Sequence, residues 1–429
     1  MAPSISFRDA FWVWLRIGLL SFGGPAGQIA LMHRMIVEER KWLDEGRFMH
    51  ALNYCMLLPG PEAQQLATYV GWLLHGVKGG LVAGTLFIIP GALVLLGLSW
   101  AYVLLGDVSA IEGLLFGLKA AVLAIVAQAM WRLSQKALHG WLSVALAVGG
   151  FLALFAFSIP FPIVVLAAAL IGALCVSYFK VQHPPRVNTD VVVRPGTKRA
   201  AFVCAGLWLA TIGVLFILFG GDSVWTQIAL FFSKLAVTTF GGAYAVLAYV
   251  AQQAVETYGW LLPGEMLDGL GLAETTPGPL ILVTQFVGFL AGFREASGMA
   301  PMLGATLAAL LTLWVTFLPC FVWIFAGAPY VEKLRENAKL AAALRAITAA
   351  VVGVIANLAL WFAFNYLFAA QQSIQFGAVE LEVPELASLD MTAALMTLIA
   401  MLCLFAVRLG VLSVIAIMAT LGIGVNLFV

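Results

Sequence analysis

Long apolar runs separated by short polar loops dominate this chain. A membrane span takes about 20 apolar residues, and several runs are long enough to cross singly: 79–106, 112–136, 139–158, 159–179, 200–219, 299–327, 342–370, 391–407 and 409–427. Four other apolar segments carry a Gly- or Pro-rich interruption near the middle: 10–37, 46–75, 224–255 and 263–291. The pattern predicts an all-α polytopic membrane protein.

The four interruptions predict breaks within helices. They are Gly23-Gly24-Pro25, Pro59-Gly60-Pro61, Gly241-Gly242 and Pro277-Gly278-Pro279. Proline has no amide donor and biases the preceding residue away from helical angles, so each break should end one helix and start another. The flanking pieces, of about 12 to 16 residues, are too short to cross alone at ~1.5 Å per residue. We therefore predict four re-entrant helical hairpins, with a full crossing as the alternative for 10–37.

A constant offset relates the two halves of the chain. It equals 218 positions in three motif pairs (240 − 22, 260 − 42, 277 − 59): Phe22 with Phe240, Trp42 with Trp260, and Pro59 with Pro277. Duplicated, broken hydrophobic segments point to the central binding site of a transporter. Arg16 and Lys234 keep the same offset (234 − 16) inside apolar stretches. This pair suggests a site for an anion.

The charge of equivalent loops predicts that the halves are inverted. Loop 33–50 carries four Lys or Arg residues, whereas its counterpart 251–268 carries none. The relation reverses further on, where the acidic loop near 107–112 is matched by Lys333, Arg335 and Lys339. Because short cytoplasmic loops are enriched in Lys and Arg, equivalent loops should lie on opposite sides of the membrane. Each inverted repeat would hold two hairpins and about four transmembrane helices.

This layout predicts four parts of the chain. Residues 1–180 form the first repeat, and 181–199 form a polar cytoplasmic linker. Residues 200–223 form an additional transmembrane helix that turns the second half over, and 224–429 form the inverted second repeat.

Composition excludes several classes of function. With 63% hydrophobic residues, 10% charged residues and a mean hydropathy of +1.02, the chain is unlike a soluble protein, which carries about 25% charged residues. No basic tract predicts nucleic-acid binding. Cysteines and histidines show no metal-ligand spacing, so we expect no metal or cofactor. No nucleophile–base set predicts an enzyme. Without an evident signal peptide or organelle address, the expected location is a bacterial inner membrane.

Several motifs resemble those of the chromate ion transporter family in its long, two-domain form. FGGP at 22–25 is followed by Gln28, a basic loop, Trp42, PGPEAQQLATYVGW from Pro59 and GLKAA at 117–121. The second half carries FGG at 240–242 and TPGP at 276–279, so the resemblance covers nearly the whole chain. It implies export of chromate from the cytoplasm, with sulfate as the related physiological oxyanion. The implied family residues are Arg16, Gly23, Gly24, Pro25, Gln28, Pro59, Gly60, Pro61, Gln65 and Lys119.

Chromate and sulfate are tetrahedral dianions, and helix N-termini bind anions through free N–H groups and a partial positive charge. We expect such ends near Pro25, Pro61, Ala243 and Pro279, where glycine lets a ligand approach the backbone. The expected backbone contacts are Gly23, Gly24, Gly60, Gly241, Gly242 and Gly278. Since Ala243 replaces the proline of the first motif, the two halves need not contribute equally.

Charged and amide side chains complete the expected site, each with a structural alternative. Arg16, Lys234 and Lys119 would attract the anion, or else pair with buried groups or snorkel to a helix end. Gln28 and Gln65 would donate to substrate oxygens, or else cross-link helices. Glu62 and Glu274 are candidates for proton coupling, or else cap helices.

The predicted function is a secondary active oxyanion transporter, with a proton antiporter as one mode of coupling. Two alternatives remain open: a carrier of sulfate or another oxyanion, and an anion channel on the same scaffold. The expected partners are the small anion and the lipid bilayer, and a homodimer stays open.

Overall fold

The structure, a computed structural model, describes residues 5–106, 108–179, 195–240, 242–328, 337–376 and 379–428. Most of the predicted linker, up to residue 194, and Gly241 lie outside the described residues. The chain forms two compact units that each draw on both sequence halves. Unit 1 comprises Met1–Gly97, Val181–Ala243 and Thr276–Ala341, and unit 2 comprises Leu98–Lys180, Tyr244–Thr275 and Ala342–Val429.

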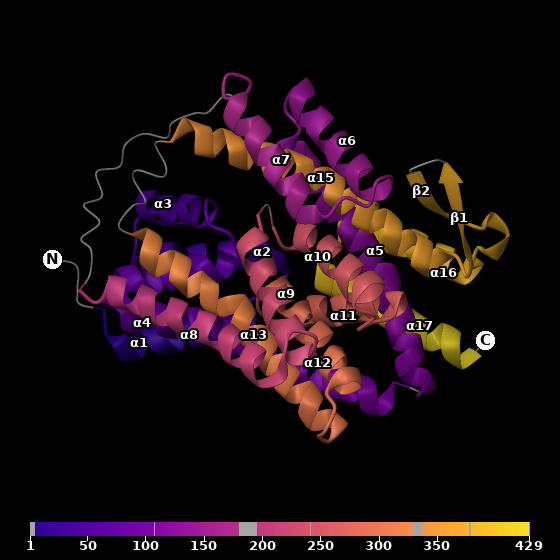
Figure 1. Cartoon of the computed structure of the whole chain (residues 1–429), viewed down its shortest axis with the longest axis horizontal. Coiled ribbons are helices and arrows are strands. Elements are labelled where there is room, and N and C mark those ends of the chain that lie inside the picture. The colour runs from indigo at the N-terminus through magenta and orange to yellow at the C-terminus, as the bar shows by residue number, and fades with distance from the viewer. Residues whose placement is uncertain are drawn as a thin grey trace. The chain divides into compact units, whose positions relative to one another are not determined.

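Unit 1 contains the helices on either side of the first and second breaks, the helix before the third break and the segment after the fourth. Within it α8, α9, α12 and α13 pack side by side (Figure 1). Its elements are α1 (Phe7–Leu20), α2 (Gly24–His33), the π-helix η1 (Arg34–Glu39), α3 (Glu45–Cys55), most of α4 (Glu62–Leu105), α8 (Thr197–Phe219), α9 (Val224–Thr238), the 3₁₀-helix η3 (Leu280–Leu282), α12 (Val283–Glu295) and α13 (Pro301–Gly327).

Unit 2 is built around α5, which packs against α11, α16 and α17. Small residues allow this approach, since a Cβ on Gly117 would overlap the Met418 carbonyl oxygen. Its elements are α5 (Ser109–Ala137), α6 (Trp141–Phe155), α7 (Phe161–Leu174), α10 (Ala243–Ala251), η2 (Gln252–Thr257), α11 (Pro263–Thr275), α15 (Ala338–Leu367), β1 (Gln371–Phe376), β2 (Val379–Pro384), η5 (Leu386–Ser388), α16 (Met391–Met401), η6 (Leu402–Ala406) and α17 (Val411–Phe428).

All four predicted interruptions break a helix. They separate α1 from α2, α3 from α4, α9 from α10, and α11 from η3. Gly23, Gly60, Gly242 and Gly278 take φ values of 84°, 120°, 102° and 96°, in a region that favours glycine. Non-helical angles at Gly76 divide α4 again, so the helical piece after the Pro-Gly-Pro break is short, as predicted.

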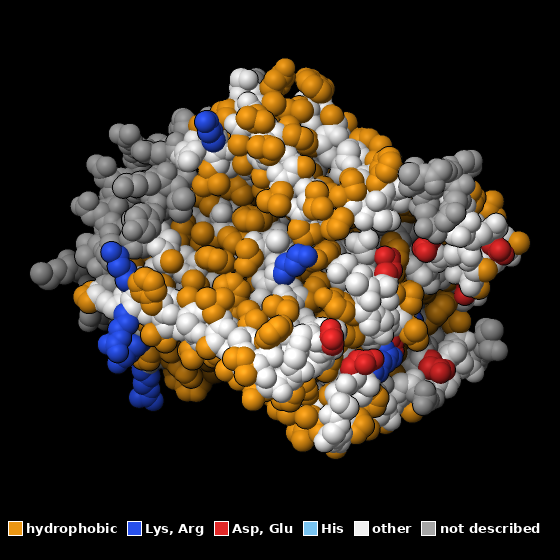
Figure 2. All heavy atoms as spheres, in the orientation of Figure 1, with side chains coloured by type: hydrophobic (Ala, Val, Ile, Leu, Met, Phe, Trp, Pro, Cys, Tyr) orange, Lys and Arg blue, Asp and Glu red, His pale blue; other side chains and the backbone are white. Residues whose placement is uncertain are grey.

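Five helices of the described part of the chain are long and apolar enough to cross a membrane: α4, α5, α8, α13 and α15. Only 11% of the most apolar stretch of α8 is buried within the protein, which suits a helix in contact with lipid. Hydrophobic side chains are also spread across the described surface on the face shown in Figure 2, where charged side chains are few. The chain is therefore a multi-pass membrane protein.

The all-α prediction is wrong for one short segment. Strands β1 and β2 form an antiparallel hairpin in which Gln371 lies opposite Pro384. The sequence of β2, VELEVP, alternates apolar and acidic residues with the period of two that is typical of a strand. Chain hydropathy hides this signal because the segment lies between two strongly apolar helices.

Glycine also sets how closely α4 approaches the second Pro-Gly-Pro break within unit 1. A Cβ on Gly91 would overlap the carbonyl oxygen of Pro277, whereas a Cβ on Gly97 meets no atom within 4 Å. We expect Gly91→Ala to lower the free energy of unfolding by about 1–3 kcal/mol through overpacking. Gly97→Ala, in the same helix, should be neutral or stabilising because alanine is the better helix former.

Thermal unfolding of the purified proteins in detergent measures both changes. A Gly91→Ala variant as stable as the Gly97→Ala variant would contradict the close approach.

Candidate functional site

The breaks of the two halves are joined by a reciprocal pair of backbone hydrogen bonds in unit 1. The Gly60 N–H donates to the Thr239 carbonyl at 2.9 Å, and the Gly278 N–H donates to the Ser21 carbonyl at 2.8 Å. The donors and the acceptors are each related by the offset of 218 positions (278 − 60 and 239 − 21). Each Pro-Gly-Pro break is thus held by the residue before the Phe-Gly-Gly motif of the other half.

Two predicted glutamines donate side-chain hydrogen bonds to the backbone of these breaks. Gln28 Nε2 donates to the Gly278 carbonyl at 2.6 Å and more weakly to Ser21, at 3.4 Å. Gln65 Nε2 donates to the Pro59 carbonyl at 2.6 Å. The Gln28 side chain thus links α2 to the second Pro-Gly-Pro break. Within the described residues, the buried Oε1 atoms of both side chains accept no hydrogen bond, and the same holds for Gln64 and Gln285.

The predicted glycines fall into an open set and a packed set. A Cβ on Gly23, Gly24 or Gly242 would meet no atom within 4 Å, so the starts of α2 and α10 are open. A Cβ on Gly60 would lie 2.8 Å from Gln65 Nε2, and one on Gly278 would lie 3.0 Å from a Leu282 methyl group. Pro61 is buried as well, whereas Pro25 is partly exposed. A ligand could therefore approach the backbone closely at the Phe-Gly-Gly breaks.

Arg16 and Lys234 are exposed on their helices, α1 and α9. Large apolar side chains flank them at equivalent positions: Trp12 and Leu19 beside Arg16, exposed by 59% and 52%, and Leu230 and Val237 beside Lys234, exposed by 46% and 39%. Arg16 forms no ion pair with a described residue, so the structural alternative of a buried carboxylate partner finds no support among these residues. An uncompensated cation in hydrocarbon costs from about 3 to more than 10 kcal/mol, so this face should border water or protein.

Lys119 has a buried partner in unit 2. Its Nζ lies 3.3 Å from Oδ1 of Asp268, and the Tyr102 hydroxyl donates to Oδ2 at 3.1 Å. Asp268 is only 4% exposed, whereas the Lys119 side chain is 23% exposed. Lys119 lies well inside α5, which argues against snorkelling at a helix end. Sequence reasoning missed this pair, although a basic residue in 112–136 and an acidic one in 263–291 were the available signal.

The two proton-coupling candidates have different surroundings. Glu274, near the end of α11, is 5% exposed and accepts a hydrogen bond from the Tyr244 hydroxyl at 2.6 Å. Glu62 is the half-buried first residue of α4, where a carboxylate also stabilises the helix end. Tyr244 was not predicted, and its place two residues after the second Phe-Gly-Gly motif is the available sequence signal for it.

A cavity of 340 Å³ in unit 2 does not suit an anion. It is lined by the carboxylates of Glu256 and Glu382 together with Gln252, Asn357 and Trp361. Two carboxylates repel a dianion, so the cavity does not enter the candidate site.

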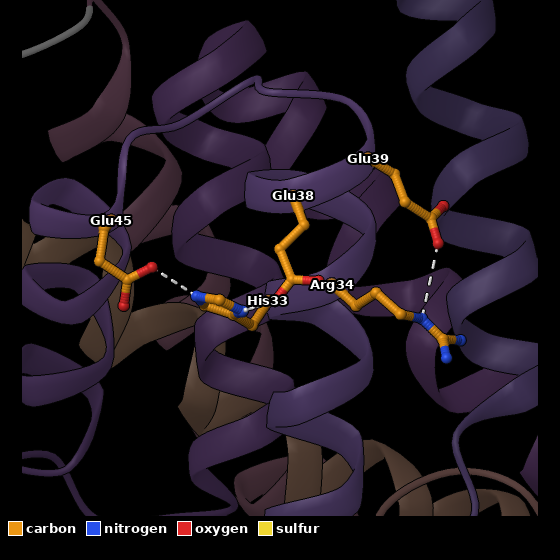
Figure 3. A network of polar contacts seen from close by, with 5 residues as sticks. All are labelled: His33, Arg34, Glu38, Glu39 and Glu45. Atoms are coloured by element: carbon orange, nitrogen blue, oxygen red, sulfur yellow. Dashed lines mark hydrogen bonds and ion pairs between the residues drawn. The ribbon is translucent and has the colours of Figure 1, made fainter.

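The open helix α2 ends in a polar network (Figure 3). His33 Nε2 lies 2.5 Å from Glu45 Oε2, and Nδ1 lies 3.1 Å from Glu38 Oε1. Beside it Arg34 pairs with Glu39 at 3.5 Å. The hydrogen bond to Glu45, and then the nearby carboxylate charges, raise the pKa of His33 above its usual value near 6.5, although partial desolvation opposes the shift. Among the described residues, no group of three or more His, Cys, Asp or Glu side chains could hold a metal ion.

Comparison with known proteins gives several matches. The sequence profile of the family described as Chromate transporter matches residues 8–173 and 226–423. The chain is 34% identical over 359 residues to the chromate transport protein of Pseudomonas aeruginosa, covering 82% of this chain and 80% of that protein. It is 30% identical over 365 residues to the probable chromate transport protein of Synechococcus elongatus, covering 83% and 84%. No solved structure matches the chain.

The His33 network should loosen as the pH rises. The pKa of His33 is raised in the folded protein, so the bridge between His33 and Glu45 stabilises the fold fully below about pH 6.5. This stabilisation is lost as the pH rises through the pKa of His33 in the folded protein. In an NMR titration of protein labelled at histidine, with His33→Gln to assign the signal, Glu45→Gln should lower the His33 pKa. Glu38→Gln should lower it less, because the hydrogen bond to Glu45 is the larger cause. A His33 signal unmoved by Glu45→Gln would contradict the bridge.

Proposed function

Because the chain belongs to the chromate transporter family, we propose that it exports chromate across a bacterial inner membrane by secondary active transport. The named relatives support chromate transport, and the apolar helices support a multi-pass membrane protein. The proposed direction has a physical basis, since an inside-negative potential drives a dianion outward by about 2.3 kcal/mol per charge per 100 mV.

The observation that carries the proposed mechanism is the reciprocal bonding of the breaks. Gly60 to Thr239 and Gly278 to Ser21 exchange equivalent partners between the halves, as expected for two repeats related by a pseudo-two-fold axis. The two ranges matched by the family also begin 218 positions apart (226 − 8). Together with the reversed loop charges, this supports two inverted repeats, each with two re-entrant hairpins.

We place the oxyanion at the open Phe-Gly-Gly breaks. The helix N-termini of α2 and α10 offer N–H groups near Gly23, Gly24 and Gly242, with no side chain in the way. Pro25 begins the first of these helices, and Gly241 completes the second motif in the sequence. Arg16 lies seven residues before Gly23 on α1, about 10 Å along the helix, and attracts the dianion toward the break. Lys234 takes the equivalent role on α9.

The remaining predicted residues have supporting roles in this proposal. Gly60, Pro61 and Gly278 form the packed frame that holds the open breaks, and Gln28 and Gln65 fix the backbone of that frame. Lys119 is a further binding position for the oxyanion in unit 2. Glu274, buried with a single tyrosine as hydrogen-bond donor, is favoured over Glu62 for proton coupling.

Flux into proteoliposomes tests the function. We expect saturable chromate uptake that responds to an imposed voltage or pH gradient, with sulfate as a competing substrate of the same shape and charge. Arg16→Ala should raise the chromate KM by roughly tenfold or more, since charge-assisted hydrogen bonds contribute about 1.5–3 kcal/mol. Arg8→Ala, which removes a cation from the first turn of the same helix, is the matched control.

Unsaturable flux that follows voltage alone would instead make the protein an anion channel. Absence of flux for either anion would overturn the proposed substrate class, and an unchanged KM in Arg16→Ala would remove Arg16 from the site.

Inversion of the halves predicts the sidedness of two equivalent loops. Cysteines introduced as Glu45→Cys and Leu262→Cys should react with a membrane-impermeant thiol reagent from opposite sides of the membrane, because residue 45 lies in the basic loop and residue 262 in the acidic one. Both positions are exposed. The partly exposed Cys175 and Cys403 should first be replaced by serine. Labelling of both positions from one side would exclude inverted repeats.

A further inference from the structure

We propose that Asp268 is an internal competitor of the oxyanion for Lys119, so that the oxyanion and a proton on Asp268 favour each other's binding. This inference rests on the proposed function, which assigns Lys119 to oxyanion binding. It concerns residues of unit 2 alone.

The geometry makes Lys119 the charge partner of Asp268. Asp268 is 4% exposed, and its Oδ1 is fully buried and accepts no hydrogen bond from a described residue. The Lys119 ammonium, 3.3 Å away, is the cation that compensates it. The Tyr102 hydroxyl donates to the other carboxylate oxygen.

Lys119 is also within reach of a second anion. Its side chain is 23% exposed, so part of its surface is not covered by Asp268 or by the helices around it. The start of α11 lies close to the Lys119 ammonium, because a Cβ on Gly264 would lie 3.4 Å from Lys119 Nζ. Glycine at this position leaves the space beside the ammonium without a side chain. A dianion that approaches this exposed side competes with the single charge of Asp268.

Withdrawal of Lys119 toward a dianion would leave Asp268 buried with only the Tyr102 hydroxyl. An isolated buried carboxylate is strongly disfavoured because it has lost its hydration, and uptake of one proton removes the charge. The proton comes from water and bonds to a carboxylate oxygen of Asp268, and no other bond is made or broken. Oxyanion binding at Lys119 therefore favours protonation of Asp268, and linkage makes the effect reciprocal.

Among the neighbouring helices described below, Lys119 is the cation that compensates the charge of Asp268. α5 contributes Lys119, α4 contributes Tyr102, and α11 itself contributes Glu265, whose negative charge also favours protonation. α17 packs against α11 and carries no ionisable side chain. The affinity for a dianion should thus rise as the pH falls, and removal of the Asp268 charge should abolish this dependence.

The test is the KM for sulfate, which stays a dianion at every pH used, of the full-length chain in proteoliposomes between about pH 6 and about pH 9. In the wild type, KM should increase with pH. Asp268→Asn should lower KM by roughly tenfold at the alkaline end, within the usual range of coupling between sites, and make it independent of pH. Lys119→Met should raise KM. Glu265→Gln, an acid removed from the same helix, should keep the rise of KM with pH but shift it to lower pH, because the Glu265 charge favours protonation of Asp268.

A structural ion pair gives a different pattern. Asp268→Asn would then lose thermal stability and transport together, and the double variant Lys119→Met with Asp268→Asn would restore both. That result, or an Asp268→Asn variant with the KM and pH profile of the wild type, would overturn the inference while chromate transport by the wild type still supports the proposed function.

Proton uptake by the wild-type protein provides a test that needs no variant. Addition of sulfate, a dianion throughout this pH range, to weakly buffered protein in detergent should remove protons from solution, as read by a pH indicator. Anion binding without proton uptake would overturn the inference, whereas absence of chromate and sulfate binding would overturn the proposed function as well.

Discussion

Within a membrane, every backbone polar group at a helix break has to find its hydrogen bond inside the protein, because the hydrocarbon core supplies none. In the proposed re-entrant arrangement, the chain meets this requirement at its two Pro-Gly-Pro breaks by exchange of hydrogen bonds between the halves. Gly60 donates to Thr239 and Gly278 donates to Ser21, and Gln28 adds a bond to the Gly278 carbonyl. Neither half satisfies its own break in this way, so the duplicated breaks depend on each other. Beside these fixed breaks, a Cβ on Gly24 or Gly242 would meet no atom within 4 Å, so the backbone there is open.

Charged side chains in the apolar segments face the same need for a partner inside the protein. Lys119 and Asp268 compensate each other, so neither stands alone in a low-dielectric setting. Arg16, by contrast, has no ion-pair partner among the described residues and lies exposed among apolar side chains. A cation that is compensated within the protein can exchange its partner, whereas one that is not compensated attracts an anion from outside. The two environments thus suggest two different contributions to oxyanion handling.

The helices and their breaks were predictable because local chemistry decides them. Run length identified five helices of membrane-spanning length, whereas the runs 139–158, 159–179, 391–407 and 409–427 form shorter apolar helices. Gly60 and Gly278 break helices through their neighbouring prolines and their own φ values. The Lys119–Asp268 pair was not predictable, since nothing in the local sequence shows that α5 and α11 pack together. The division of the glycines into open and packed positions was equally hidden. It depends on whether a side chain such as Gln65 lies where a Cβ would be.

Charge movement links the proposed site to the direction of transport. Exchange of the oxyanion for a proton requires the two to exclude each other, whereas competition of Asp268 with the oxyanion for Lys119 makes them bind together. A dianion that moves with one proton carries a net charge of about −1, and an inside-negative potential still favours its exit by about 2.3 kcal/mol per 100 mV. Export therefore needs no antiported proton, and a proton that leaves with the anion lowers the electrical drive by half without reversing it. Protonation of Asp268 would then keep the buried carboxylate neutral while Lys119 holds the substrate. The co-exported proton halves the electrical driving force, and the remaining half still favours export.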